Sequence, residues 1–171
     1  MAKLYEKFGE FNSAEEINRA AAAQKAEGDM EAVMEIAKEN GIDEEDAQAF
    51  IDGEEEELCT PLTAAFGKLT VEAKHLQFKG VMEDWLHELQ QECADSAELQ
   101  VLVRRKGRTL AGYVAELVDD SFKNKVIVSQ EVSGKCSKEV REIMGSHPLT
   151  IGSTNLAGRR KIMHRYYGRE K

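Results

Sequence analysis

A change of hydrophobic period within residues 109–132 restricts the fold of this chain more than any other feature. Apolar side chains first recur three and four positions apart, the spacing of one face of an α-helix. This stripe consists of Leu110, Tyr113, Val114, Leu117, Val118 and Phe122. Thr109 precedes the stripe and can cap the helix. The β-branched residues that follow favour a short strand. They are Val126, Ile127, Val128 and Val132. The stretch therefore predicts a helix that runs directly into a strand.

Helical patterns also cover most of the remaining chain. Ser13 and Glu16 have the spacing of a capping box, and Thr60-Pro61 is typical of a helix start. A second short strand is predicted at 149–151, where it could pair with 126–128. With only 2 prolines and 6% aromatic residues, little interrupts the helices. The predicted fold class is therefore mainly α, a helical bundle with one small two-stranded β element in the C-terminal half.

The pattern also predicts details of packing and domain organisation. Trp85 is expected to anchor the core from a helix that begins near Val81, and Asp95 has a capping spacing to Glu98. Glycines end three short helices near the N-terminus. We therefore expect an acidic N-terminal helical unit over 1–57, followed by a helical core with a basic C-terminal region over 58–171.

The net charge of −9 conceals a strong asymmetry along the chain. Residues 1–100 contain 8 Lys and Arg against 25 Asp and Glu, whereas residues 101–171 contain 15 against 7. Such asymmetry indicates contact with nucleic acid or with a nucleic-acid-binding partner. The alternative, weighed equally, is that both halves are simply solvated surfaces that keep the protein in solution.

The acidic half contains two dense runs of carboxylates. A helix rises about 1.5 Å per residue and duplex DNA carries about one charge per 1.7 Å, so these runs approach the charge density of a duplex. A basic groove on another protein would attract them. The predicted partner-binding residues are Asp43, Glu44, Glu45, Asp46, Glu54, Glu55, Glu56 and Glu57.

The basic half contains two clusters suited to phosphate contacts. Guanidinium groups bind phosphates through two hydrogen bonds, and tyrosines stack on bases. The predicted nucleic-acid-binding residues are Arg104, Arg105, Lys106, Arg108, Arg159, Arg160, Lys161, Arg165, Tyr166 and Tyr167, with Arg169 beyond them. The alternative, given equal weight, is that the tyrosines are half-buried packing residues and the arginines pair with carboxylates of the acidic half.

No enzyme motif is visible, and no metal or cofactor is expected. An EF-hand loop starting at Asp43 fails because Gln48 stands where glycine is required. The four histidines lack zinc spacing, and the three cysteines are far apart, which fits reduced thiols in a cytosol. The N-terminus lacks a secretory signal and no apolar run could span a membrane, so we expect a cytoplasmic, non-enzymatic protein without membrane contact.

Several stretches carry a resemblance to known proteins. In the N-terminal half they are EKFGEFNSAEEINRAAAAQKAEGD, ENGIDEEDAQAFIDG and TPLTAAFGKL. These resemble small proteins of phages and mobile elements of Firmicutes, which include type II anti-CRISPR proteins that inhibit Cas9. In the C-terminal half, KGRTLAGYVAELVDDSFKNKVIV and MHRYYGRE are similar to PcfK-like proteins of conjugative elements.

The resemblance implies stoichiometric binding to Cas9, or to its guide RNA complex, in a bacterial host cell, with loss of target DNA binding or cleavage. The alternative function is a DNA- or RNA-binding accessory protein of a phage or conjugative element. A homodimer is compatible with either function.

Overall fold

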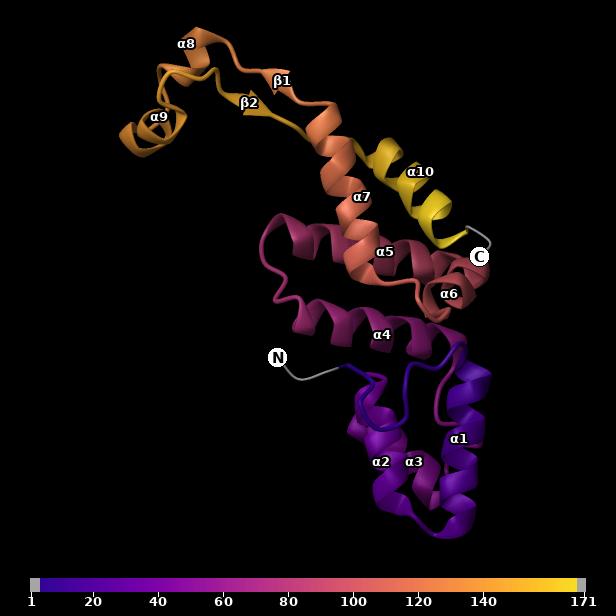
Figure 1. The fold of residues 1–171 in the computed structure, drawn as a ribbon. Coiled ribbons are helices and arrows are strands. Elements are labelled where there is room, and N and C mark those ends of the chain that lie inside the picture. Colours follow the sequence, from indigo (N-terminus) through magenta and orange to yellow (C-terminus); the bar gives the residue numbers. More distant parts are fainter. Residues whose placement is uncertain (1–3, 169–171) are drawn as a thin grey trace. The chain divides into compact units, whose positions relative to one another are not determined.

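The computed structural model describes residues 4–168, which form ten helices and one two-stranded antiparallel sheet (Figure 1). The predicted fold class is therefore confirmed. The first six helices are α1 (Ala14–Glu27), α2 (Met30–Glu39), α3 (Glu44–Asp52), α4 (Pro61–His75), α5 (Val81–Asp95) and α6 (Ala97–Arg104). The later elements are α7 (Leu110–Lys123), β1 (Val126–Ile127), α8 (Gln130–Ser133), α9 (Lys138–Met144), β2 (Thr150–Ile151) and α10 (Leu156–Tyr167).

The chain divides into two compact units. The first unit contains the described residues of Met1–Tyr113 and Met163–Lys171, and the second is Val114–Ile162. The chain passes from one unit to the other inside α7 and returns inside α10. The sequence-based domain boundary at residue 57 stays a prediction.

Helix starts in the first unit follow the capping signals of the sequence. Ser13 Oγ accepts a hydrogen bond from the Glu16 amide at 3.2 Å, and the Glu16 carboxylate accepts one from the Asn12 amide at 2.7 Å. Thr60 Oγ1 accepts from the Thr63 amide at 3.1 Å, with Pro61 as the first helical residue. These bonds satisfy amides that have no partner within the helix, which is why α1 and α4 have defined starts.

The hydrophobic core of the acidic region lies between α1, α2 and α3. Ile17, Val33 and Ile36 are completely buried there, and Phe50 is 3% exposed. Burial of a side chain of this size is worth roughly 1.5–3 kcal/mol, so these residues contribute to the packing of the three helices against one another.

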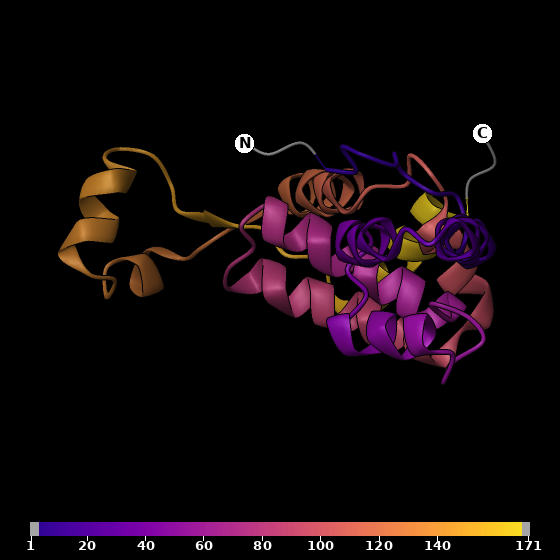
Figure 2. The ribbon, with the colours of Figure 1, turned by 90° about the horizontal axis from the view of Figure 1, so that it is seen from below.

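In the second unit, the predicted pairing of two strands is confirmed. Val126 faces Ile151 and Ile127 faces Thr150, and the Val128 amide donates to the Leu149 carbonyl at 2.8 Å. The strands lead to α8 and α9 at the end of this hairpin (Figure 1, Figure 2). Thr154 Oγ1 donates to the Asp120 carboxylate of α7 at 2.6 Å, which ties the return of the hairpin to that helix.

Three expectations about individual residues are wrong. Val132 lies in α8, because its amide donates to Ser129 O in a helical turn. Ser96, one residue after Asp95, caps α6 by accepting a hydrogen bond from the Leu99 amide. Trp85 is only partly buried, so it does not anchor the core.

The apolar stripe of α7 is buried only in its first part. Val118 is 49% exposed and Phe122 is 68% exposed, whereas Leu110, Tyr113 and Leu117 are buried. The Lys125 ammonium lies 3.9 Å from the centre of the Phe122 ring, a cation–π contact that partly covers it. Helical periodicity therefore identified which apolar residues share one face of α7, but not how many of them are buried.

Candidate protein-binding surface

The first acidic run occupies the start of α3 in the first unit. Glu44, Glu45 and Asp46 form its first turn, where carboxylates interact favourably with the positive end of the helix dipole. Asp43 is the N-cap residue, but its side chain makes no capping hydrogen bond. The local preference for acidic residues at a helix start therefore leaves these carboxylates directed to solvent.

The second acidic run forms the connection between α3 and α4. It begins after Gly53, which ends α3 with a φ of +81°, a left-handed conformation suited to glycine. The far end of the connection is held by Asn18, whose amide side chain exchanges two hydrogen bonds with the backbone of Cys59, both 2.9 Å long. The four glutamates thus project from a segment that is fixed at both ends.

All eight predicted partner-binding carboxylates are exposed. Within residues 4–168, none of the eight forms an ion pair. The Lys25 ammonium donates to the Phe50 carbonyl at 2.5 Å and lies 4.7 Å from the Phe50 ring centre. The negative charge of both runs is consequently available to a partner.

Arg104, predicted to bind nucleic acid, is instead buried in the first unit. Its side chain is 1% exposed, and Nη2 donates to the Asn40 side-chain oxygen at 2.5 Å. Asn40 is itself completely buried and donates to the Ile36 carbonyl at 2.8 Å. A guanidinium enclosed in this way does not reach a phosphate, so Arg104 is removed from the predicted nucleic-acid-binding set.

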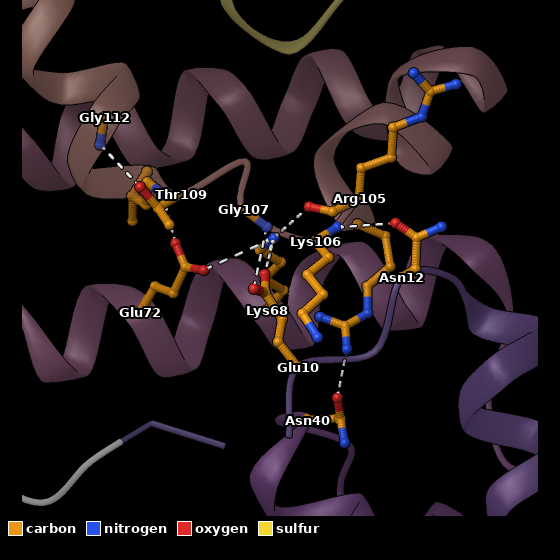
Figure 3. Close-up of polar contacts among 12 residues, drawn as sticks. Glu10, Asn12, Asn40, Lys68, Glu72, Arg105, Lys106, Gly107, Thr109 and Gly112 are labelled. Atoms are coloured by element: carbon orange, nitrogen blue, oxygen red, sulfur yellow. Dashed lines mark hydrogen bonds and ion pairs between the residues drawn. The ribbon is translucent and has the colours of Figure 1, made fainter. Parts of the chain in front are cut away.

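A buried polar cluster holds the backbone next to Arg104 (Figure 3). The Lys68 ammonium donates to Glu10 at 2.6 Å and to the Arg105 carbonyl at 2.8 Å, and it lies 3.9 Å from the Glu72 carboxylate. Glu72 in turn accepts the Leu110 amide at 2.5 Å. Burial lowers the pKa of Lys68 and raises the pKa of Glu72. The cluster thereby fixes the connection between α6 and α7 from both of its ends.

This cluster was not anticipated from the sequence. The available signal was Lys68 and Glu72 four residues apart in a helix whose neighbouring residues are mostly apolar. An i,i+4 pair is usually read as a solvated surface pair, and only packing of α4 against α6 makes it an internal one.

The other predicted nucleic-acid-binding residues are divided between the two units. Five side chains are exposed: Arg105, Lys106 and Arg165 in the first unit, and Arg160 and Lys161 in the second. Arg108 and Arg159 are partly buried, and the Arg159 guanidinium donates to the Thr154 carbonyl. Arg169 lies outside the described residues.

Tyr166 and Tyr167, predicted to stack on bases, are also buried. Tyr166 is 9% exposed and Tyr167 is completely buried, with their rings packed edge to face at 4.9 Å between centroids. The Tyr166 hydroxyl donates to the Thr109 carbonyl at 2.9 Å and accepts from the Thr109 amide at 3.1 Å. Both tyrosines therefore pack in the interior, and they are more deeply buried than the half-buried packing of the alternative interpretation.

A scan against family models, a search of curated proteins and a search of solved structures each found no match to this chain. The functional argument therefore depends on what its surfaces and buried groups can do.

Two of the three cysteine thiols are unsuited to nucleophilic chemistry. Burial raises the pKa of Cys59 and of Cys93 to about 12, so both remain protonated at neutral pH. In the described part of the chain, no three His, Cys, Asp or Glu side chains are grouped so that they could hold a metal ion. None of the helices there is long and apolar enough to span a bilayer.

The Tyr166→Phe variant should lose about 1–2 kcal/mol of its free energy of unfolding, because the partly buried Thr109 amide would lose its hydrogen-bond acceptor. Urea unfolding measures this loss. Tyr167→Phe is the matched control, since the Tyr167 hydroxyl is buried without a hydrogen-bond partner among the described residues. It should be neutral or slightly stabilising, and equal losses in the two variants would contradict the role given to the Tyr166 hydroxyl.

Proposed function

We propose that this chain is a non-enzymatic anti-CRISPR protein that binds Cas9, or its guide RNA complex, in the bacterial cytoplasm and blocks target DNA binding or cleavage. The observation that supports the proposal is the set of eight exposed carboxylates without ion pairs in residues 4–168. The resemblance of the N-terminal half to small phage and mobile-element proteins supports Cas9 as the partner.

The electrostatic argument is that of a surface competing with DNA. A channel that holds nucleic acid is lined by cations, and a dense carboxylate surface is attracted to it over distances of the order of the Debye length. Four consecutive glutamates in a segment fixed at both ends offer their charges without much further ordering, which reduces the entropic cost of binding. Inhibition should therefore weaken as the salt concentration rises.

The test replaces Glu54, Glu55, Glu56 and Glu57 together with Gln and measures Cas9 cleavage of target DNA at increasing inhibitor concentration. We expect the unsubstituted protein to inhibit at near-equimolar ratio. The variant should need about ten-fold more protein or higher for the same inhibition, because each lost charge contact is worth several tenths of a kcal/mol.

The matched control replaces four exposed glutamates outside the two runs, Glu6, Glu15, Glu27 and Glu98, with Gln. It changes the net charge by the same amount and should leave inhibition nearly unchanged. Equal weakening in both variants would indicate attraction by net charge alone. Full inhibition by the first variant would show that residues 54–57 are not part of the binding surface. Absence of inhibition by the unsubstituted protein would refute the proposal.

The second candidate, a DNA- or RNA-binding accessory protein, is favoured by the five exposed cations of the basic half. In this case the protein alone should shift DNA or RNA in a gel, with an affinity that falls steeply with salt. Replacing Arg160, Lys161 and Arg165 with Gln should abolish the shift. A shift of unchanged strength would reject these three side chains as the contact.

A further inference from the structure

A groove of about 1210 Å3 opens on the first unit between α2, α3 and α4. Its apolar lining comes from residues that are distant in the sequence, among them Phe8, Met30, Met34, Ile51 and Val71. Met30 is 37% exposed, and the other four are only partly buried. The groove therefore offers apolar surface to a partner without disturbing the core beneath it.

The lining includes flexible side chains that adapt to a bound apolar surface. Methionine has three rotatable bonds and a polarisable sulfur, and it is over-represented where a groove receives a partner helix. Met30 and Met34 are one helical turn apart on α2, so both face the groove along the same side of this helix. This spacing suits the apolar stripe of an amphipathic helix.

The charged lining is predominantly negative. It includes five carboxylates, Asp29, Glu31, Glu35, Asp43 and Glu44, against the three lysines Lys7, Lys38 and Lys74. The Lys7 ammonium lies 3.3 Å from the Glu35 carboxylate, so this pair leaves four carboxylates against two lysines. A segment with lysines or arginines beside its apolar stripe would match this lining in both hydrophobicity and charge.

The groove is also continuous with the first acidic run. Asp43 and Glu44 belong both to the groove lining and to the first run of exposed carboxylates. A basic partner attracted by these carboxylates would thus meet apolar surface next to them. This apolar surface can hold the partner after the charges have attracted it, and it is much less sensitive to salt.

We infer that the groove between α2, α3 and α4 is a docking site for a basic amphipathic helix of the partner protein. This inference rests on the proposed function, because it names the element of the partner that the acidic surface receives.

The probe is a synthetic peptide of Leu and Lys arranged as a basic amphipathic helix, added to protein labelled with 13C at the methionine methyl groups. The methyl signals of Met30 and Met34 should shift on titration, whereas those of Met82 and Met163 should not. A peptide with Glu in place of Lys should not bind. Shifts spread over all methionines, or equal binding of the Glu peptide, would overturn the inference.

Met30→Gln tests the groove itself, and Met82→Gln on α5 is its matched control. Met82 is 40% exposed, close to the 37% of Met30, and it does not line the groove. Met30→Gln should weaken binding of the basic peptide about ten-fold, because it removes one apolar contact, and Met82→Gln should leave it unchanged. Equal affinities of the two variants would overturn the inference.

The same two variants separate this inference from the proposed function. If the inference holds, Met30→Gln weakens inhibition of Cas9 and Met82→Gln does not. Full inhibition by Met30→Gln, together with weak inhibition by the variant of Glu54–57, would overturn the groove as the docking site and leave the proposed function intact. Absence of inhibition by the unsubstituted protein would refute both.

Discussion

The Lys68→Met variant should lose about 3–5 kcal/mol of its free energy of unfolding, the range for removing one partner of a buried ion pair. Lys68 is completely buried and donates to Glu10 and to the Arg105 carbonyl. Methionine fills a similar volume but donates no hydrogen bond. The variant would leave the buried carboxylate of Glu72 and the partly buried carboxylate of Glu10 without their cation, and a buried unpaired charge is costly. Urea unfolding monitored by circular dichroism measures the loss.

The matched control is Lys7→Met in the same unit. Lys7 pairs with Glu35 at 3.3 Å, but the lysine side chain is 63% exposed, so its removal should cost less than about 1 kcal/mol. In the double variant Lys68→Met/Glu72→Gln, part of the loss should be recovered because one uncompensated carboxylate is gone. Similar losses for Lys68→Met and Lys7→Met would show that the cluster is not desolvated as the structure describes it.

The Gly67→Ala variant should lose at least about 2 kcal/mol, even though alanine is the better helix former by about 1 kcal/mol. The reason is a close approach of two backbones. A Cβ atom on Gly67 would overlap with the carbonyl oxygen of Asn40 and with the backbone of Gly41. Because the obstructing atoms are backbone, no side-chain rotation can relieve the overlap, and α4 must move away from the end of α2.

The control for Gly67→Ala is Thr70→Ala, one turn further along α4 on its exposed side. It tests the gain in helix propensity without the steric overlap and should be neutral or slightly stabilising. Thermal unfolding of the two variants measures the difference. A Gly67→Ala protein as stable as Thr70→Ala would contradict the close packing of α4 against the Asn40–Gly41 turn.

The predictions from sequence that the structure confirms depend on interactions within a few residues. Capping by Ser13, Thr60 and Thr109 is of this kind, since donor and acceptor lie three residues apart. The strand pairing was also recoverable, because two short β-branched segments in a helical chain have few alternative partners. Val132 shows the limit of this reasoning. The preference of β-branched residues for strands depends on context, and Val132, which lies beyond the end of β1, adopts the helical conformation of α8.

The sequence by itself determined most of the helix starts, because a capping side chain and the amide that it accepts from lie three residues apart. It also indicated that two short strands pair, because β-branched segments in a helical chain have few alternative partners. The order of acidic and basic residues along the chain is a property of the sequence itself. Only the tertiary structure decided which charges remain at the surface. The buried Arg104 side chain donates a hydrogen bond to Asn40, 64 residues away, and the buried Lys68 donates one to Glu10, 58 residues away. The groove likewise exists only where α2, α3 and α4 meet. Contacts between residues so distant depend on the packing of the helices, and no local pattern in the sequence encodes them directly.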